Sequence, residues 1–294
     1  MIGAGKSASE RRRVTLGGYP AGVCDDVPVP HHPTDRQHDH GPDRDHEHHH
    51  HPHAPLDQAA FPHDLAELAA WVGEHCTAGG RVLEVGCGDG ALTRRLAEQG
   101  FDVVGIDPHA PDGDLFRCCR LEEVVDPGIG PPLERAFDAV VASVSLHHVH
   151  DLDRSMANLR AVLAPRGALL LREFDRGALD HEPTMRWWFD RLQARHGERP
   201  VLTSLAAAVD QSFDEFVATW RARMDGHVIP WTELREGLTI GGFVTESEDS
   251  TPYLFRYGLS EAERDDEERA IAAGEIRAVG VRWRGSAAAP STSR

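Results

Sequence analysis

The chain is short of lysine and of long apolar runs. Lys6 is the only lysine among 294 residues, and it lies in a stretch with no apolar periodicity, which excludes catalysis through a lysine side chain. No run approaches the roughly 18 apolar residues that a membrane-spanning helix needs. Arg11, Arg12 and Arg13 are followed by glycine and proline instead of an apolar signal core. These absences predict a cytoplasmic protein with no membrane partner.

Positive charge and paired cysteines are also scarce. The 31 Lys and Arg residues face 48 Asp and Glu residues, which gives a formal net charge of -17. A surface that acidic repels phosphate backbones and anionic lipid headgroups, so it argues against nucleic acid as a partner. The five cysteines are odd in number and include no CxxC pair. Neither a disulfide framework nor a zinc site is therefore indicated.

Residues 1–55 hold almost no periodic apolar pattern, and ten of the 23 positions from His31 to His53 are histidine. Such a segment cannot bury a core, so a disordered tail is expected. Histidine beside carboxylates can bind Zn or Ni, but fixed ligand spacing is absent. We expect at most weak metal binding by the tail, no metal in the folded domain at 56–285, and a disordered C-terminus at 286–294.

Strands and helices alternate from residue 61 to residue 172. Asp64 is expected to cap a first helix. The expected strands are 81–85, 102–106, 116–119, 138–143 and 168–172, and the helices between them include 91–99 and 151–163. The main strands are apolar without alternation, as a sheet covered on both faces requires. The order predicts a doubly wound α/β sheet with parallel strands.

Beyond residue 175 the alternation pauses. Two helical stretches, near 184–195 and 204–224, are interpreted as a helical lid inserted at about 177–230. An insert after the fifth strand lies at the carboxyl edge of the sheet, where ligands bind. The remaining expected elements are a helix near 232–238, a strand near 243–248, a charged helix near 261–273 and a last strand near 278–284.

The last expected strand alternates. Val279, Val281 and Trp283 alternate with Gly280 and Arg282. This pattern is typical of an edge strand with one face in water.

The segment VLEVGCGDGAL carries the clearest chemical signal. It places Glu84 ahead of Gly86, Cys87, Gly88 and Gly90, between an expected strand and an expected helix. Glycines there let the backbone approach a ligand at the N-terminus of the helix, which indicates a nucleotide-type ligand. The same glycines also fit the dinucleotide fingerprint, so they alone do not distinguish NAD from other cofactors.

Glu84 favours a cationic cofactor. A carboxylate two residues before the glycines would repel a pyrophosphate by a few kcal/mol. S-adenosylmethionine carries an ammonium and a sulfonium and no phosphate, so the sequence favours it over NAD. Asp107, at the end of the second strand, is placed to accept both ribose hydroxyls, which either cofactor offers.

Four motifs, LEVGCGDG, VVGID, FDAVVASVSLHHV and LAPRGALLL, occur in an order and spacing that resemble class I S-adenosylmethionine-dependent methyltransferases of the small-molecule type. The resemblance covers residues 64–172 well and the remainder weakly. It implies a Rossmann-like sheet of about seven mostly parallel strands whose last strand, near 278–284, runs antiparallel. It also implies methyl transfer to a small-molecule acceptor by in-line displacement.

The resemblance also implies a set of cofactor-binding residues. Residues of the first strand, of the loop after it and of the end of the fourth strand would contact the methionine end of the cofactor. Asp107 would hold the ribose, and Glu122 would lie near the adenine amino group. The implied set is Glu84, Gly86, Cys87, Gly88, Gly90, Asp107, Leu121, Glu122, Ala142 and Ser143.

Methyl transfer displaces a leaving group at a carbon that the sulfonium already activates, so alignment is the main task and a base is optional. His147 and His148 follow the fourth strand at the carboxyl edge and are the catalytic candidates. Glu173, Asp175 and Trp187 are the candidates for substrate contact. Each of these five also has an ordinary interpretation, as a packing, capping or loop residue.

Two alternatives stay open at this point. One is an NAD-dependent oxidoreductase on a Rossmann fold, against which Glu84 argues. The other is a non-catalytic protein that keeps the fold and binds S-adenosylmethionine. The sequence does not show whether O, N, S or C is methylated, since fold does not fix substrate, and it does not show the oligomeric state.

Overall fold

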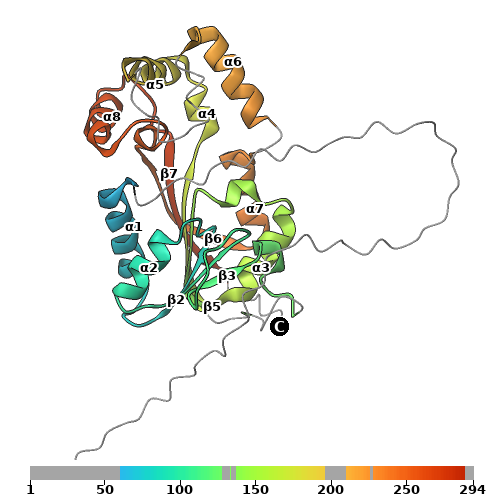
Figure 1. Cartoon of the computed structure of the whole chain (residues 1–294). Coiled ribbons are helices and arrows are strands. Elements are labelled where there is room, and N and C mark those ends of the chain that lie inside the picture. Colours follow the sequence, from blue (N-terminus) through green and yellow to red (C-terminus); the bar gives the residue numbers. More distant parts are fainter. Residues whose placement is uncertain (1–59, 128–132, 134–136, 196–209, 226–227, 289–294) are drawn as a thin grey trace, which may run out of the picture.

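The structure is a computed structural model that describes residues 60–127, 133, 137–195, 210–225 and 228–288 (Figure 1). The predicted tail at 1–55, with its histidines, lies outside the described residues. Of the predicted C-terminal segment 286–294, Ser286 and Ala287 belong to the last strand.

A seven-stranded sheet forms the centre of the molecule, in the order β3-β2-β1-β4-β5-β7-β6. The strands β1 to β5 pair in parallel, and β7 runs antiparallel to both β5 and β6. This confirms the predicted doubly wound sheet and its antiparallel last strand. The strands are β1 (Arg81–Val85), β2 (Asp102–Asp107), β3 (Phe116–Cys118), β4 (Phe137–Ser143), β5 (Leu163–Phe174), β6 (Phe243–Thr251) and β7 (Gly280–Ala287).

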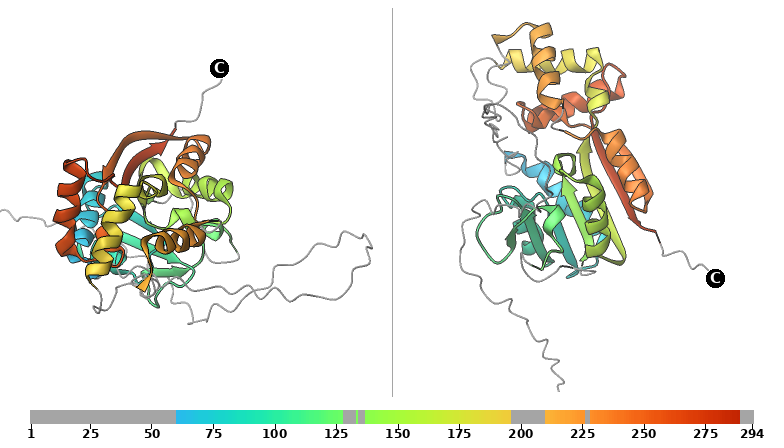
Figure 2. Two further views of the ribbon diagram at one scale, coloured as in Figure 1. Left: turned by 90° about the horizontal axis from the view of Figure 1, so that it is seen from above. Right: turned by 90° about the vertical axis from the view of Figure 1, so that its right-hand side faces the viewer.

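Helices cover both faces of the sheet (Figures 1 and 2). Helices α1 (Pro62–His75) and α2 (Ala91–Glu98) lie on one face, and α3 (Leu152–Val162) and α7 (Trp231–Ile240) lie on the other. Consecutive residues of a strand contact different helices, because their side chains point alternately to the two faces of the sheet. Val82 packs with the α1 and α2 side chains, whereas Leu83 packs with those of α3 and α7.

A third group of helices gathers beyond the carboxyl end of β5 (Figure 1). Helices α4 (Arg176–Leu179), α5 (Glu182–Ala194) and α6 (Phe213–Met224) follow β5 in the chain, and we call these three the lid. Helix α8 (Arg264–Ala272) lies beside them. The lid shares an aromatic core with α8 and with the segment after β6, and this core includes Trp188 and Trp220. The predicted helix at 184–195 corresponds to α5, and residues 204–209 of the next one lie outside the described ranges.

The last strand is not an edge strand, so this prediction was wrong. β7 lies between β5 and β6, and β6 is the edge. Val281 and Trp283 of β7 enter the core under α3 and α7, whereas Arg282 points to the other face and lies over the ring of Trp71 at 4.8 Å. An arginine stem and guanidinium packed against a helix can cover an interior strand. The alternation therefore indicates that the two faces of β7 have different surroundings, and not that β7 lacks a neighbouring strand.

Asp64 does not cap α1, so that prediction was wrong as well. The N-cap is Phe61, and Asp64 lies in the first turn with its side chain buried. Its Oδ2 accepts a hydrogen bond from Arg172 of β5 at 2.8 Å, and its Oδ1 accepts one from Arg256, in the turn Leu254–Arg256 after β6. Burial alone would raise the pKa of Asp64, but the two guanidinium charges outweigh it and lower the pKa.

Asp64→Asn should lower the free energy of unfolding by about 3 to 5 kcal/mol, because it leaves two buried guanidinium groups without their carboxylate. Denaturant unfolding followed by circular dichroism measures this. Glu67→Gln is the matched control in the same helix: Glu67 pairs with Arg264 at 2.8 Å and is 51% exposed, so its loss should cost less than about 1 kcal/mol. An equally small cost at Asp64 would contradict the prediction.

Candidate functional site

The carboxyl ends of β1, β4 and β5 bring the predicted site residues to one edge of the sheet, on the side of the lid (Figure 1). Glu84 comes from β1, Ser143 from β4 and Glu173 from β5. The loop after β1 and the loop after β4 meet at this edge. It is the place where a doubly wound sheet offers a crevice to a ligand.

The glycine loop after β1 is fitted closely against the loop after β4. Gly86 has a φ of 73°, and a Cβ at that position would lie 2.3 Å from the Cβ of Ser145. Ser145 Oγ in turn donates to the carbonyl oxygen of Val85 at 2.7 Å. A side chain at position 86 would push the two loops apart, so the contact requires glycine.

Asp107 ties the glycine loop to β2. Its Oδ2 accepts a hydrogen bond from Gly88 N at 3.1 Å, and its Oδ1 accepts one from His109 N at 2.8 Å. Each carboxylate oxygen has a second lone pair, so the half-buried side chain can also accept from two hydroxyl groups. This geometry fits the predicted ribose contact.

Glu84 is fully buried behind the loop. Its Oε2 accepts a hydrogen bond from Thr93 Oγ1 of α2, and its Oε1 has no partner in the part of the chain that the structure describes. Burial raises the pKa of Glu84 to about 8. A buried polar atom without a hydrogen bond costs free energy, and a donor on a bound ligand would compensate for it.

His147 and Glu173, predicted separately and for different roles, form one buried pair. His147 Nδ1 lies 2.6 Å from Glu173 Oε2, with the two residues 4% and 1% exposed. Glu173 Oε1 accepts hydrogen bonds from Ser145 N at 3.1 Å and from Leu146 N at 2.9 Å. A carboxylate only accepts, so Nδ1 carries a hydrogen, and in the neutral form of this tautomer the lone pair is on Nε2. Such an imidazole can take a proton at Nε2.

The backbone that leads into this pair is strained. Val144 has a φ of 57°, a left-handed conformation that β-branched residues rarely adopt. Its N–H donates to the carbonyl oxygen of Arg172 at 2.6 Å, and the next two N–H groups point at Glu173. Strain of this kind persists only where surrounding contacts impose it. The Glu173 carboxylate supplies those contacts.

The other candidates for chemistry lie outside this pair. His148 is exposed, and its ring centroid is 4.1 Å from that of His147. Asp175 is the N-cap of α4 and accepts from Gly177 N at 2.8 Å. Trp187 is buried in the lid core, with the guanidinium of Arg191 over its ring at 3.6 Å. The structure shows an ordinary structural contact for each of the three.

The residues proposed for adenine lie in the short turn after β3. Leu121 is buried, and its carbonyl oxygen accepts from Asn158 Nδ2 at 2.9 Å. Glu122 Oε1 accepts from His150 N at 2.7 Å. Glu122 therefore holds the loop after β4 in place.

The remaining residues of the predicted cofactor set are buried. Ala142 packs in the core under α3, and Ser143 Oγ accepts from Arg172 Nε at 3.0 Å. Cys87 is a buried free thiol, and burial raises its pKa far above the usual value. A thiol that stays protonated is not a nucleophile, which argues against covalent chemistry at Cys87.

An aromatic wall that was not predicted from the sequence lies beside His147. The Phe174 ring meets the His147 ring edge-on, with centroids 5.0 Å apart, and stacks on the Tyr253 ring at 5.6 Å. Tyr257 packs against Tyr253 at 5.3 Å. Phe174 directly follows Glu173 and could have been found from that neighbour. The tyrosines lie about 80 residues further along the chain, and no local pattern links them to the pair.

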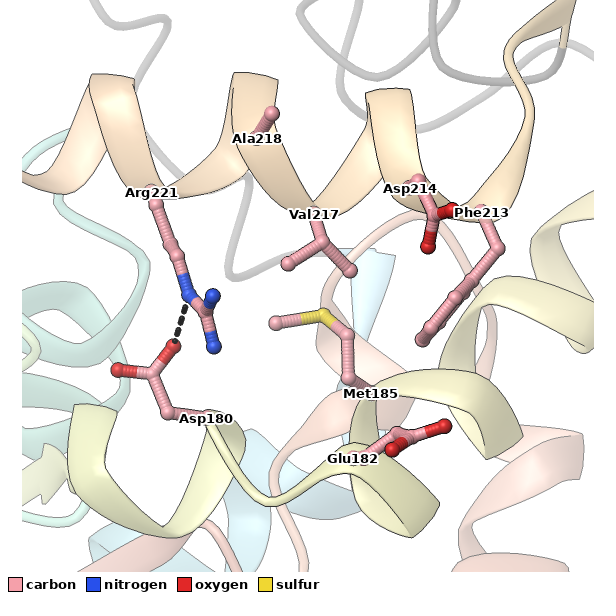
Figure 3. A pocket seen from close by; sticks show the side chains of 8 residues that line it. All are labelled: Asp180, Glu182, Met185, Phe213, Asp214, Val217, Ala218 and Arg221. Carbon is pink, nitrogen blue, oxygen red and sulfur yellow. Dashed lines mark hydrogen bonds and ion pairs between the residues drawn. The ribbon is translucent and has the colours of Figure 1, made fainter.

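A pocket is also present within the lid, away from this edge. Figure 3 shows it between α5 and α6, with the ion pair of Arg221 Nε and Asp180 Oδ1 at 3.0 Å on one side. Its lining combines apolar side chains with three carboxylates and one arginine. It is lined by Asp180, Glu182, Met185, Phe213, Asp214, Val217, Ala218 and Arg221. None of these residues belongs to the glycine loop or to the His147–Glu173 pair, so the pocket is separate from the candidate site.

The described residues include neither a metal-binding cluster nor a membrane-spanning helix. No group of three or more His, Cys, Asp or Glu side chains among them is arranged to hold a metal ion. No helix among them combines the length and the apolar character that crossing a bilayer requires.

Curated relatives match part of the chain. The mitochondrial ubiquinone biosynthesis O-methyltransferase of Bos taurus is 34% identical over 119 residues, which cover 35% of this chain and 31% of that protein. The ubiquinone biosynthesis O-methyltransferase of Rhodopseudomonas palustris (strain BisB5) is 31% identical over 132 residues, which cover 38% of this chain and 49% of that protein. The chain thus spans between about a third and a half of the length of these relatives.

Among solved structures, the Burkholderia thailandensis 1,6-didemethyltoxoflavin-N1-methyltransferase, with 1,6-didemethyltoxoflavin and S-adenosylhomocysteine bound, is 18% identical with a TM-score of 0.44. That match covers 79% of this chain and 80% of the other. A likeness at this level says nothing about the function of this chain. A family model described as "Methyltransferase domain" matches residues 47–212, more than half of the chain. That match includes the glycine loop and the His147–Glu173 pair, and the chain therefore belongs to the methyltransferase-domain family, as its motifs predicted.

Proposed function

We propose that this protein transfers a methyl group from S-adenosylmethionine to a small-molecule acceptor. The observation that carries the proposal is Oε1 of Glu84, which is fully buried beside the glycine loop and has no partner among the described residues. An ammonium group donates hydrogen bonds and favours the ionised carboxylate, so it satisfies this atom. A pyrophosphate offers neither, which argues against the NAD-dependent alternative. Membership of the methyltransferase-domain family supports the activity.

The residues at the sheet edge fit this cofactor. When bound, S-adenosylmethionine supplies a methyl group already activated by a sulfonium. Glu84 would take the ammonium of its methionine end, and Asp107, with a free lone pair on each oxygen, would accept from the ribose. The glycines of the loop would let the backbone approach it. Leu121 and Glu122 remain the residues proposed for the adenine.

We further propose that His147 removes a proton from the acceptor. Glu173 holds the imidazole through Nδ1 and leaves the lone pair of Nε2 for the proton. A hydroxyl group needs such a base more than an amine does, because a neutral hydroxyl is the weaker nucleophile. The names of the curated relatives, which are O-methyltransferases, support an oxygen acceptor. The substrate contacts of Asp175 and Trp187 and a location in the cytoplasm stay predictions from the sequence, whereas the exposed His148, the other catalytic candidate, serves as the comparison for His147.

Binding of S-adenosylmethionine should release a proton. With a pKa of about 8, Glu84 is protonated at neutral pH in the free protein, and an ammonium beside it favours the ionised form. Affinity should therefore rise by up to about tenfold per pH unit from pH 6 and level off near pH 8, where an α-amino group also begins to lose its proton. Calorimetry in two buffers of different ionisation enthalpy measures the proton release.

Glu84→Gln should abolish this proton release and weaken binding by about 1 to 3 kcal/mol. Thr93→Val is the control, because it removes the hydrogen bond to Oε2 and keeps the carboxyl group that titrates. Binding of NAD in preference to S-adenosylmethionine by the parent protein would refute the proposed cofactor.

His147→Ala should lower turnover by about 10² to 10⁴-fold and leave cofactor affinity within about twofold, because the base acts on the acceptor only. Steady-state kinetics on an accepted hydroxyl substrate and calorimetry with the cofactor separate the two effects. His148→Ala is the matched control: its ring touches that of His147 but is exposed, so its turnover should change by less than about tenfold. Full turnover in the His147 variant would leave alignment alone as the mechanism.

A further inference from the structure

Arg172 shares one face of the sheet with Glu84. The register pairs Glu84 with Val141 and Ser143 with Arg172 on neighbouring parallel strands. Paired residues and those two apart in a strand point to the same face. The side chains of Glu84, Ser143 and Arg172 therefore line the side covered by α1 and α2, at the carboxyl edge. Arg172 lies two strands from Glu84, about 10 Å across the sheet.

The guanidinium of Arg172 is held in a fixed position. Its Nε donates to Ser143 Oγ at 3.0 Å and its NH1 donates to Asp64 Oδ2 at 2.8 Å. These contacts engage two of the five N–H donors of a guanidinium. Burial lowers the pKa of Arg172 to about 10, so it is cationic at neutral pH. Its charge also lowers the pKa of Glu84, against the larger effect of burial.

We propose that Arg172 binds the α-carboxylate of the cofactor's methionine end while Glu84 binds the ammonium. The inference rests on the proposed function and names the residue that completes the site. An α-amino acid carries both charges on one carbon, so its binding site needs an anionic and a cationic group whose side chains reach the same place. The unpartnered oxygen of Glu84 and the remaining donors of Arg172 supply these two groups on one face. Ser143 positions Arg172.

Arg256 has the same carboxylate partner but different surroundings. It is 4% exposed, as against 7% for Arg172, and it also binds Asp64. Its guanidinium carbon lies 5.3 Å from the ring centre of Tyr253 and 5.1 Å from that of Phe255. The buried carboxyl of Glu267, which accepts from the backbone N–H groups of 253–255, is a further charge near it. Arg256 therefore stabilises the turn after β6 and serves as a matched control.

Calorimetry with S-adenosylmethionine and with its decarboxylated analogue tests the proposal without any assay of activity. The parent protein should prefer S-adenosylmethionine by about 10- to 100-fold, the range expected for hydrogen bonds between charged groups. Arg172→Met should bind the two ligands equally, because the preference requires the contact with the carboxylate. Arg256→Met also loses one ion pair with Asp64, but it should keep the parent's preference.

A preference that survives Arg172→Met, or that disappears in Arg256→Met instead, would overturn the assignment. If Arg172→Met does not fold, Ser143→Ala replaces it: Arg172 then loses its Nε partner, and the preference should fall by about threefold or more. An unchanged preference in Ser143→Ala counts against the proposal. A parent protein that binds neither ligand refutes the proposed cofactor itself, whereas tight binding without any preference refutes only the role of Arg172.

Discussion

Glu173 is the residue on which the arrangement of the site depends. Its buried carboxylate accepts hydrogen bonds from two consecutive backbone N–H groups and contacts the ring of His147. These contacts hold the left-handed turn at Val144, and the next residue, Ser145, packs on the glycine loop. The cofactor loop and the proposed base are therefore two ends of one rigid connection. Loss of the Glu173 carboxylate would disturb both the loop and the base. A loss of turnover in a Glu173 variant is therefore informative only beside that of a His147 variant.

Asp64 has a similar structural role on the other face of the sheet, because it also links several elements through a buried carboxylate. It joins the first helix, the fifth strand and the turn after the sixth strand through two arginines. A buried pair of this kind contributes little net stability compared with apolar packing, but removing one partner is costly. The arrangement therefore fixes where Arg172 lies more than it stabilises the fold. A site for a zwitterionic ligand needs that fixed position, since charge recognition depends on distance.

Local signals predicted the fold well and the site only in part. Glycines bound β1, and its observed limits are the predicted 81–85. β5 begins at Leu163, five residues before its predicted start, because Pro165 and Gly167 indicated a turn where the chain passes through a left-handed Arg166 and continues as strand. The partners of Asp64 lie 108 and 192 residues away, and the partner of His147 lies 26 residues away. Such pairings depend on the strand order, which no local pattern contains.

The structure changes the reason why Glu84 favours S-adenosylmethionine. An ionised carboxylate would repel a pyrophosphate, but burial raises the pKa of Glu84 to about 8, so the free protein holds it neutral at pH 7. A neutral carboxyl group repels an anion only weakly. The discrimination arises instead on binding: an ammonium ion favours the ionised form and gains a charge-assisted hydrogen bond, whereas a pyrophosphate can only accept the O–H of the neutral form and is repelled once the group ionises. Selectivity for a cation therefore increases with pH up to the pKa, because less free energy is then needed to remove the proton.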